Sequence, residues 1–104
     1  MDRGAVLDAV SRFRKALEAR GIHVERMVLF GSHATGNARE GSDIDLVVVS
    51  DDFAGKGYWE RLNVLSDAIY EIFEPIEALA MTSDEWEEGA SPLVEYARTG
   101  QVIE

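Results

Sequence analysis

The sequence predicts an α/β domain in which a small sheet is covered by helices. Segments with apolar residues at helical spacing alternate along the chain with short, nearly continuous apolar runs. Glycine or proline stands near most of the junctions between these segments. A chain of 104 residues can bury a single core, so we expect residues 1–104 to form one domain.

The first half of the chain is predicted to form a helix, a strand, a short helix, a polar loop and a second strand, over residues 5–20, 24–30, 32–37, 38–42 and 43–49. Gly21 stands where a helix C-terminal glycine belongs. The first strand ends in an almost wholly apolar run, which is typical of a buried central strand. Ser32 is of the type that caps a helix N-terminus.

The second half is predicted to form a loop, a long helix, a third strand, a short acidic turn, a helix and a closing strand, over residues 51–57, 58–74, 76–81, 84–88, 92–98 and 102–103. Apolar residues recur at helical spacing from Tyr58 onward, and Pro75 ends that helix because the residue before a proline avoids helical geometry. Thr82 or Ser83 can cap the acidic turn.

The chain is strongly acidic, with twenty acidic and ten basic residues and a formal net charge of −10. Direct binding to DNA or RNA is therefore not expected, because it depends on clustered lysine and arginine. An acidic protein can still bind a nucleotide when a divalent cation bridges the two. The charge also suits a basic protein partner, although a soluble surface explains it equally well.

No apolar run approaches the roughly 20 residues that a membrane-spanning helix needs. The N-terminus shows no secretory signal, and the chain contains no cysteine, which excludes disulfides and thiolate metal sites. We therefore expect a cytoplasmic protein without a membrane segment.

The most informative pattern is a Gly-Ser pair after the first strand, followed by two aspartates at the head of the second. Asp43 and Asp45 stand two positions apart, so in a strand their side chains point to the same face. Gly31 allows close backbone approach, and a helix that begins at Ser32 attracts phosphate with its free amides. Two converging carboxylates beside such a turn suit a magnesium-bound triphosphate.

Each half of the pattern also has a plain structural interpretation. Asp43 can cap the loop while Asp45 is solvated on an edge strand, and Gly-Ser alone is usually a turn with a helix cap. The spacing from Gly31 to Gly36 is that of a Walker A loop, but Asn37 stands where that motif requires lysine. The spaced combination of both halves favours the functional interpretation.

This combination resembles the signature of the nucleotidyltransferase superfamily that includes DNA polymerase beta: Gly-Ser, a gap of about ten residues, then Asp-x-Asp. Gly31, Ser32, Asp43 and Asp45 fall on that signature. The chain is similar to the minimal nucleotidyltransferases, many of which are encoded beside a small helical HEPN-type protein as the antitoxin of a toxin–antitoxin pair. The resemblance implies the palm-like fold of DNA polymerase beta, a small mixed sheet with helices packed on it. The residues alone leave strand order and direction open.

The resemblance implies an enzyme that transfers AMP from ATP to a hydroxyl, on a HEPN-type partner protein, with two Mg²⁺ ions. Gly31 and Ser32 would bind the β- and γ-phosphates, and Asp43 and Asp45 would hold the metal. The alternative is a degenerate member of the superfamily, a module that neutralises or scaffolds its partner by binding alone.

Two further positions are implied with less direct matches. A third carboxylate on a neighbouring strand would hold the second metal and activate the hydroxyl, and Glu77 is the best candidate, with Glu74 as the alternative. Many relatives carry aspartate there, and a solvated strand-end glutamate is the plain interpretation. His33 and Thr35 replace arginines of many minimal members; His33 would donate to phosphate, or be an ordinary exposed helix residue.

Overall fold

The computed structural model describes residues 2–39, 41–89 and 91–103. Residues 1, 40, 90 and 104, which include one position of the predicted loop 38–42, lie outside the described residues. The helices are α1 (Arg3–Ala19), α2 (Ser32–Thr35), α3 (Tyr58–Ile72), α4 (Ser83–Glu88), α5 (Pro92–Ala97) and the 3₁₀ turn η1 (Asp51–Phe53). The strands are β1 (Arg26–Phe30), β2 (Ile44–Val49), β3 (Ile76–Met81) and β4 (Gln101–Ile103).

Within the described residues the strands form one mixed sheet in the order β3-β2-β1-β4. β1 is antiparallel to both β2 and β4, whereas β2 and β3 are parallel. Helix α3 makes the crossover between the parallel pair. The predicted α/β fold with a small mixed sheet is therefore confirmed.

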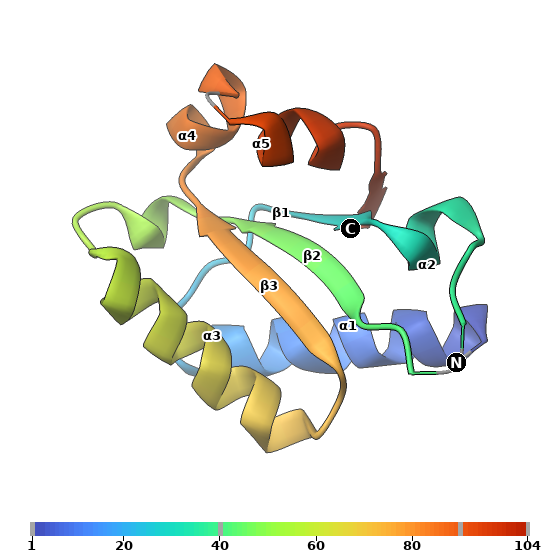
Figure 1. The fold of residues 1–104 in the computed structure, drawn as a ribbon. Helices are drawn as coiled ribbons and strands as arrows, with labels where there is room; N and C mark the ends of the chain where they lie inside the picture. The colour runs from blue at the N-terminus through green and yellow to red at the C-terminus, as the bar shows by residue number, and fades with distance from the viewer. Residues whose placement is uncertain (1, 40, 90, 104) are drawn as a thin grey trace.

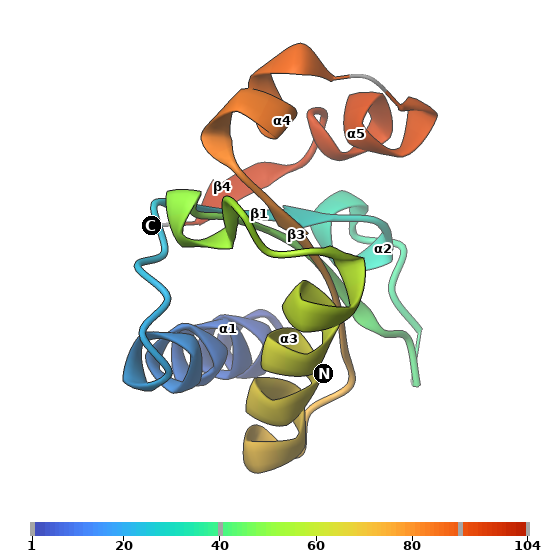
Figure 2. The same ribbon diagram turned by 90° about the vertical axis from the view of Figure 1, so that its left-hand side faces the viewer.

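The sheet lies between two layers of helices, with α1 and α3 on one face and α4 and α5 on the other (Figures 1 and 2). The central strands β1 and β2 are buried on both faces, which is why their sequences are almost continuously apolar. Toward α1 and α3 they pack Leu29 and Leu46 against Phe13. Toward α4 and α5 they pack Val47 against Trp86.

The predicted elements are confirmed in type, and their boundaries differ by a few residues. β3 occupies the predicted residues 76–81, and α1 ends with the amides of Gly21 and Ile22 bonded back to Glu18 and Leu17. The predicted loop after β2 contains the 3₁₀ turn η1, because Phe53 turns inward and is fully buried.

Asp51 links this turn to the start of α4. Its carboxylate accepts hydrogen bonds from the Ser83 amide (3.1 Å) and hydroxyl (2.7 Å), and these bonds lower the pKa of Asp51. None of the helices in the described part of the chain has the length and apolar composition of a membrane span.

The short strand β4 is held against β1 through a close approach at Gly100. A Cβ at residue 100 would collide with the carbonyl of Leu29 and lie 3.0 Å from the carbonyl oxygen of Ala97. We expect Gly100→Ala to lower the free energy of unfolding by about 1–3 kcal/mol, measured by urea denaturation. Gly57→Ala is the control, because a Cβ there meets nothing within 4 Å, and we expect a change below about 0.5 kcal/mol. Equal losses for the two variants would contradict this packing.

Candidate active site

Asp45 and Glu77 lie side by side because of strand register. Asp45 is opposite Phe30 of β1 on one side and Glu77 of β3 on the other. The neighbours of Asp45, Ile44 and Leu46, fill the core under α1 and α3, so alternation turns Asp45 to the opposite face. The helices α4 and α5 cover the part of that face that is remote from Asp45. On the part that they leave uncovered, Asp45 is half-buried and Glu77 is exposed.

Gly31 brings the turn after β1 directly against Asp45. Its backbone, with φ 72° and ψ −153°, lies in a region that is essentially restricted to glycine. A Cβ at residue 31 would collide with Oδ2 of Asp45 and lie 3.2 Å from its Cγ. Two independent features therefore require glycine at position 31: the backbone conformation and the close carboxylate of Asp45.

Gly31 also caps α2, so the prediction that Ser32 is the N-cap is wrong. The carbonyl of Gly31 accepts the amides of Ala34 (3.1 Å) and Thr35 (3.2 Å), and α2 spans only 32–35 instead of 32–37. The helix ends at Gly36, in the left-handed conformation. Because Ser32 is not used as a cap, its hydroxyl and the first amides of α2 remain beside the turn at Gly31.

His33 is buried instead of exposed, which excludes the interpretation as an ordinary exposed helix residue. Its Nε2 lies 3.2 Å from the carbonyl oxygen of Ser42. Because a carbonyl only accepts, Nε2 carries the proton, and the ring fastens α2 to the loop that delivers Asp43. Nδ1 is the ring atom left for a ligand, and phosphate binding by His33 stays a prediction.

The acids of the site raise the pKa of Asp45. Burial contributes most, followed by the charge of Glu77, a hydrogen bond shared with the Glu77 carboxyl group and the charge of Asp43; His33 acts in the opposite direction. Among the described residues, none of the salt bridges involves Asp43, Asp45 or Glu77. Within the described part of the chain, the negative charge of these three acids is therefore not balanced by an ion pair.

Glu74, the alternative third carboxylate, is engaged elsewhere. Its Oε1 accepts a 2.7 Å hydrogen bond from Nη2 of Arg12, whose Nη1 binds the carbonyl oxygen of Ile72 at 3.2 Å. This bridge fastens the end of α3 to α1. Glu77 is thus the candidate that lies next to Asp45.

A cavity of about 570 Å³ opens beside the two acids. Asp45, Glu77 and Ser66 form its polar part, and apolar side chains from β1, α3, β3 and α5 form the rest, among them Phe30, Ile69 and Leu93. Sequence reasoning did not identify these apolar residues, because α3 and α5 meet at this place only through the tertiary fold.

A second hollow, of about 320 Å³, lies on the other side of the turn. It is bounded by Gly31, Thr35, Tyr96, Thr99 and Gln101. The last three residues were not predicted as part of the site, since only the pairing of β4 with β1 brings them beside Gly31.

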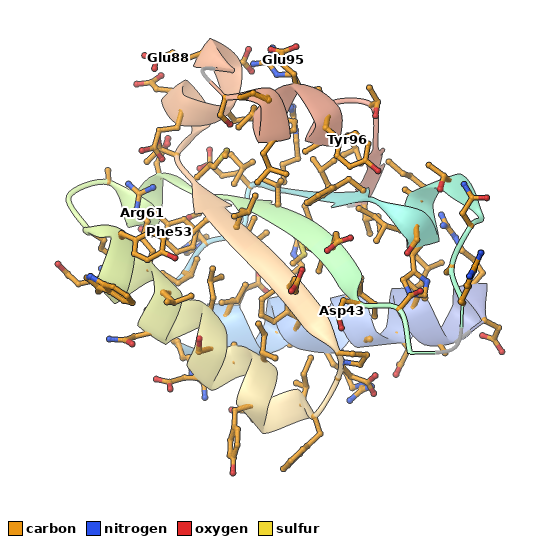
Figure 3. The ribbon with its side chains drawn as sticks, in the orientation of Figure 1. Asp43, Phe53, Arg61, Glu88, Glu95 and Tyr96 are labelled. Atoms are coloured by element: carbon orange, nitrogen blue, oxygen red, sulfur yellow. The ribbon has the colours of Figure 1, made fainter. Side chains whose placement is uncertain are left out.

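Asp43 completes the acidic group from the start of β2, where Figure 3 shows it at the end of the strand remote from Arg61. It is exposed and adds to the charge near Asp45. In residues 2–39, 41–89 and 91–103, no group of three or more His, Asp or Glu side chains is gathered closely enough to hold a metal ion. The structure thus pairs Asp45 with Glu77 and leaves Asp43 slightly apart.

Comparison with solved structures shows a similar fold. One is named a "putative nucleotidyltransferase", from Sulfolobus solfataricus; it has a TM-score of 0.66 and 19% identity, over 81% of this chain and 73% of that one. Another structure with the same name has a TM-score of 0.60 and 22% identity, over 97% of this chain and 99% of that one. No curated protein matches the chain significantly.

The sequence itself matches the family described as the nucleotidyltransferase domain over residues 10–95. The match includes the Gly-Ser turn, both aspartates and Glu77. Most of the chain is covered, and the mixed sheet agrees with the similar structures. The chain belongs to the nucleotidyltransferase domain family.

Proposed function

We propose that this chain transfers AMP from ATP to a hydroxyl group of a partner protein, in a reaction that requires Mg²⁺. The observation that carries the proposal is the contact of the Gly31 backbone with the Asp45 carboxylate, next to Glu77. It joins a phosphate-binding turn and an acidic pair in one place, as the resemblance to minimal nucleotidyltransferases implies. Membership of the family supports nucleotidyl transfer in general; nucleotide, metal and acceptor are proposals.

The acids present are suited to a divalent cation. Carboxylate oxygens are the hard ligands that Mg²⁺ prefers. Burial raises the pKa of Asp45 most, and the charges of Glu77 and Asp43 raise it further; a cation would offset that repulsion. Asp43, Asp45 and Glu77 would hold it, with two ions proposed by resemblance. Bound Mg²⁺ neutralises phosphate charge and favours the alkoxide form of the acceptor. We propose that Asp43 approaches the pair when the metal–nucleotide binds.

The protein groups have distinct roles in this proposal. The Gly31 backbone, Ser32 and the first amides of α2 orient the β- and γ-phosphates, with His33 positioning the loop of Asp43. Glu77 accepts the proton of the acceptor hydroxyl, whose oxygen forms a bond to the α-phosphorus. The bond from the α-phosphorus to the leaving oxygen breaks, and pyrophosphate departs. Positioning and charge supply the catalysis.

The acceptor is proposed to belong to another protein. The resemblance to minimal nucleotidyltransferases makes a HEPN-type helical protein the first acceptor to test, with this chain as the antitoxin. The net charge of −10 favours a basic partner surface over a nucleic acid.

A second candidate function is neutralisation of a partner by binding alone. It is favoured by the spacing of the acids, which are not gathered as a metal site within the described residues. The bond of His33 to Ser42 also favours it, because that ring nitrogen is not available to a phosphate.

Mg²⁺–ATP binding is the central test. Calorimetric titration should show Mg²⁺-dependent ATP binding, weakened about tenfold or more in Asp43→Asn plus Asp45→Asn, since a bidentate metal contact is lost. The double variant Asp67→Asn plus Asp84→Asn makes the same charge change on exposed helix positions and should bind normally. With a HEPN-type partner, ATP labelled at the α-phosphate should label the partner. Protection of cells by the Asp43/Asp45 double variant would instead support binding alone.

The raised pKa of Asp45 predicts a pH-dependent gain in stability for Asp45→Asn. The folded state binds the Asp45 proton more readily than the unfolded state does. Stability therefore falls as pH rises from the ordinary aspartate pKa through the raised pKa of the folded state. At neutral pH, without metal, Asp45→Asn should melt a few degrees above the parent protein. Below about pH 3.9, the ordinary value for aspartate, the gain should vanish. An equal gain for Asp67→Asn, on an exposed part of α3, would contradict the assignment of this gain to the environment of Asp45.

Gly31→Ala separates the collision with Asp45 from backbone strain. Both Gly31 and Gly36 have positive φ, but a Cβ at residue 36 meets nothing within 4 Å. Gly36→Ala should lose about 1–2 kcal/mol of stability in urea denaturation, the cost of a left-handed backbone. Gly31→Ala should lose more, because its backbone region is restricted to glycine and its Cβ collides with Asp45. Only Gly31→Ala should also displace Asp45 and weaken Mg²⁺–ATP binding, by about tenfold to a hundredfold. Normal binding by Gly31→Ala would refute the importance of this contact.

A further inference from the structure

The outer edge of β3 presents backbone groups to solvent. β3 is the first strand of the sheet order, and within the described residues only β2 pairs with it. The carbonyls of Pro75 and Met81 accept amides from the β2 side, of Ile44 (2.7 Å) and Ser50 (2.8 Å). Since backbone groups alternate along a strand, residues 76, 78 and 80 direct theirs to the outer edge. The amide of Ile76 is bonded to the carbonyl oxygen of Glu74 (2.8 Å), so the amide and carbonyl of Ala78 are the central groups that a partner strand can pair with.

A groove follows this edge. It consists of the cavity of about 570 Å³ beside the acids and an adjoining one of about 420 Å³, which share Leu62, Leu65, Ala78 and Leu79. Ala78 and Leu79 point to opposite faces of the sheet, so the hollows lie at the edge and not over one face. In Figure 1, β3 is nearest the viewer, with α3 below it and α4 and α5 above. We call these two cavities the β3-edge groove.

The two ends of the β3-edge groove differ. Asp45 and Glu77 line one end. At the other, Arg61 donates from Nη1 to the carbonyl oxygen of Ala80 (3.4 Å) and to Glu85 (2.6 Å), and its guanidinium lies over the ring of Phe53. Figure 3 shows Arg61 and Phe53 at the end of the molecule away from Asp43. Arg61 therefore occupies the outward carbonyl of Ala80, and the part of the edge that a partner strand can pair with ends there.

We propose that an extended, basic segment of the partner protein pairs with β3 in this groove and presents the acceptor hydroxyl beside Glu77. The inference rests on the proposed function and names the form in which the acceptor arrives. Residues directly opposite on adjacent strands have their Cβ atoms about 4.5–5.5 Å apart on the same face. A hydroxyl residue opposite Glu77 thus extends the row of Asp45 and Glu77 by one strand.

The walls define the rest of the segment. Residues on either side of the hydroxyl residue face α3, where Leu62, Leu65 and Ile69 offer an apolar surface. Only one end of the groove is acidic, where Asp45 and Glu77 stand. At the other end Glu85 is already paired with Arg61 (2.6 Å), and Lys56 also lines the cavity. The expected segment therefore has apolar residues flanking the hydroxyl residue and basic residues beyond them on the side of Asp45 and Glu77.

Charge argues against a second copy of this chain as the occupant. Antiparallel pairing of two β3 edges places the Glu77 side chains of both copies on one face, where their charges repel. This repulsion adds to that between chains that each carry a net charge of −10. A basic segment removes this repulsion.

The test uses an array of short peptides, each with one central Tyr, Ser or Thr, together with Mg²⁺ and ATP labelled at the α-phosphate. Glycerol serves in parallel as an acceptor that needs no edge pairing. Labelled peptides should carry the pattern of basic, apolar and hydroxyl residues derived above. Hydrogen exchange should show protection of the outward amide of Ala78 by the best peptide.

Ala78→Pro removes an outward amide without breaking the pairing with β2, and proline is tolerated at such edge positions. It should reduce peptide labelling about tenfold more than it reduces transfer to glycerol, because one peptide carbonyl loses its partner. Ala78→Val is the matched control, similar in size and with its amide intact. If the proline variant does not fold, the exchange measurement on the parent protein decides.

The outcomes separate this inference from the proposed function. Transfer to glycerol with no labelled peptide, with unpatterned peptides, or with equal labelling by Ala78→Pro overturns edge pairing and leaves nucleotidyl transfer standing. A homodimer that Ala78→Pro dissociates makes a second copy the occupant and also overturns it. No Mg²⁺-dependent product with any acceptor overturns both.

Discussion

The candidate site depends on how closely the backbone of Gly31 passes the carboxylate of Asp45. Strand register sets Phe30, Asp45 and Glu77 in one row across three strands, and the turn at Gly31 begins where β1 leaves that row. Any side chain at residue 31 would collide with the carboxylate of Asp45. The absence of a single methyl group thus lets the turn before α2 and the pair of Asp45 and Glu77 lie in one place.

The same arrangement has an electrostatic cost. Burial and the charge of Glu77 both disfavour the ionised form of Asp45, and the salt bridges of the described residues lie elsewhere. A protein interior selected only for stability would place an apolar residue there, as the rest of β2 does with Leu46, Val47 and Val48. A buried acid that is electrostatically unfavourable, in an otherwise well-packed sheet, is typical of a functional site.

The sequence predicted the elements because local signals and burial agree along the chain. β3 was predicted as an apolar run after Pro75, and the α/β class follows from the order of the segments. Alternation predicted that Asp43 and Asp45 share a face; the position of Glu77 beside Asp45 depends on the register of β2 with β3. What could not be predicted depends on contacts between distant residues: Arg12 withdraws Glu74 from the site, and Ser42 receives the ring of His33. The N-cap of α2 was missed for a local reason, since Gly31 caps with its carbonyl and serine is the commoner signal.

The parallel pairing of β2 and β3 has a consequence for where an acceptor approaches. Because β3 is parallel to β2 and lies at the edge, Glu77 stands between Asp45 and solvent, on the side away from Gly31. In the proposed function, a nucleotide oriented by the Gly31 turn and a hydroxyl arriving at the β3 edge would meet across the two carboxylates from opposite directions. Such an approach would suit an in-line displacement, in which nucleophile and leaving group lie on opposite sides of the phosphorus. Glu77 would be the first of the two carboxylates to meet the proposed acceptor, because β3 lies at the edge of the sheet.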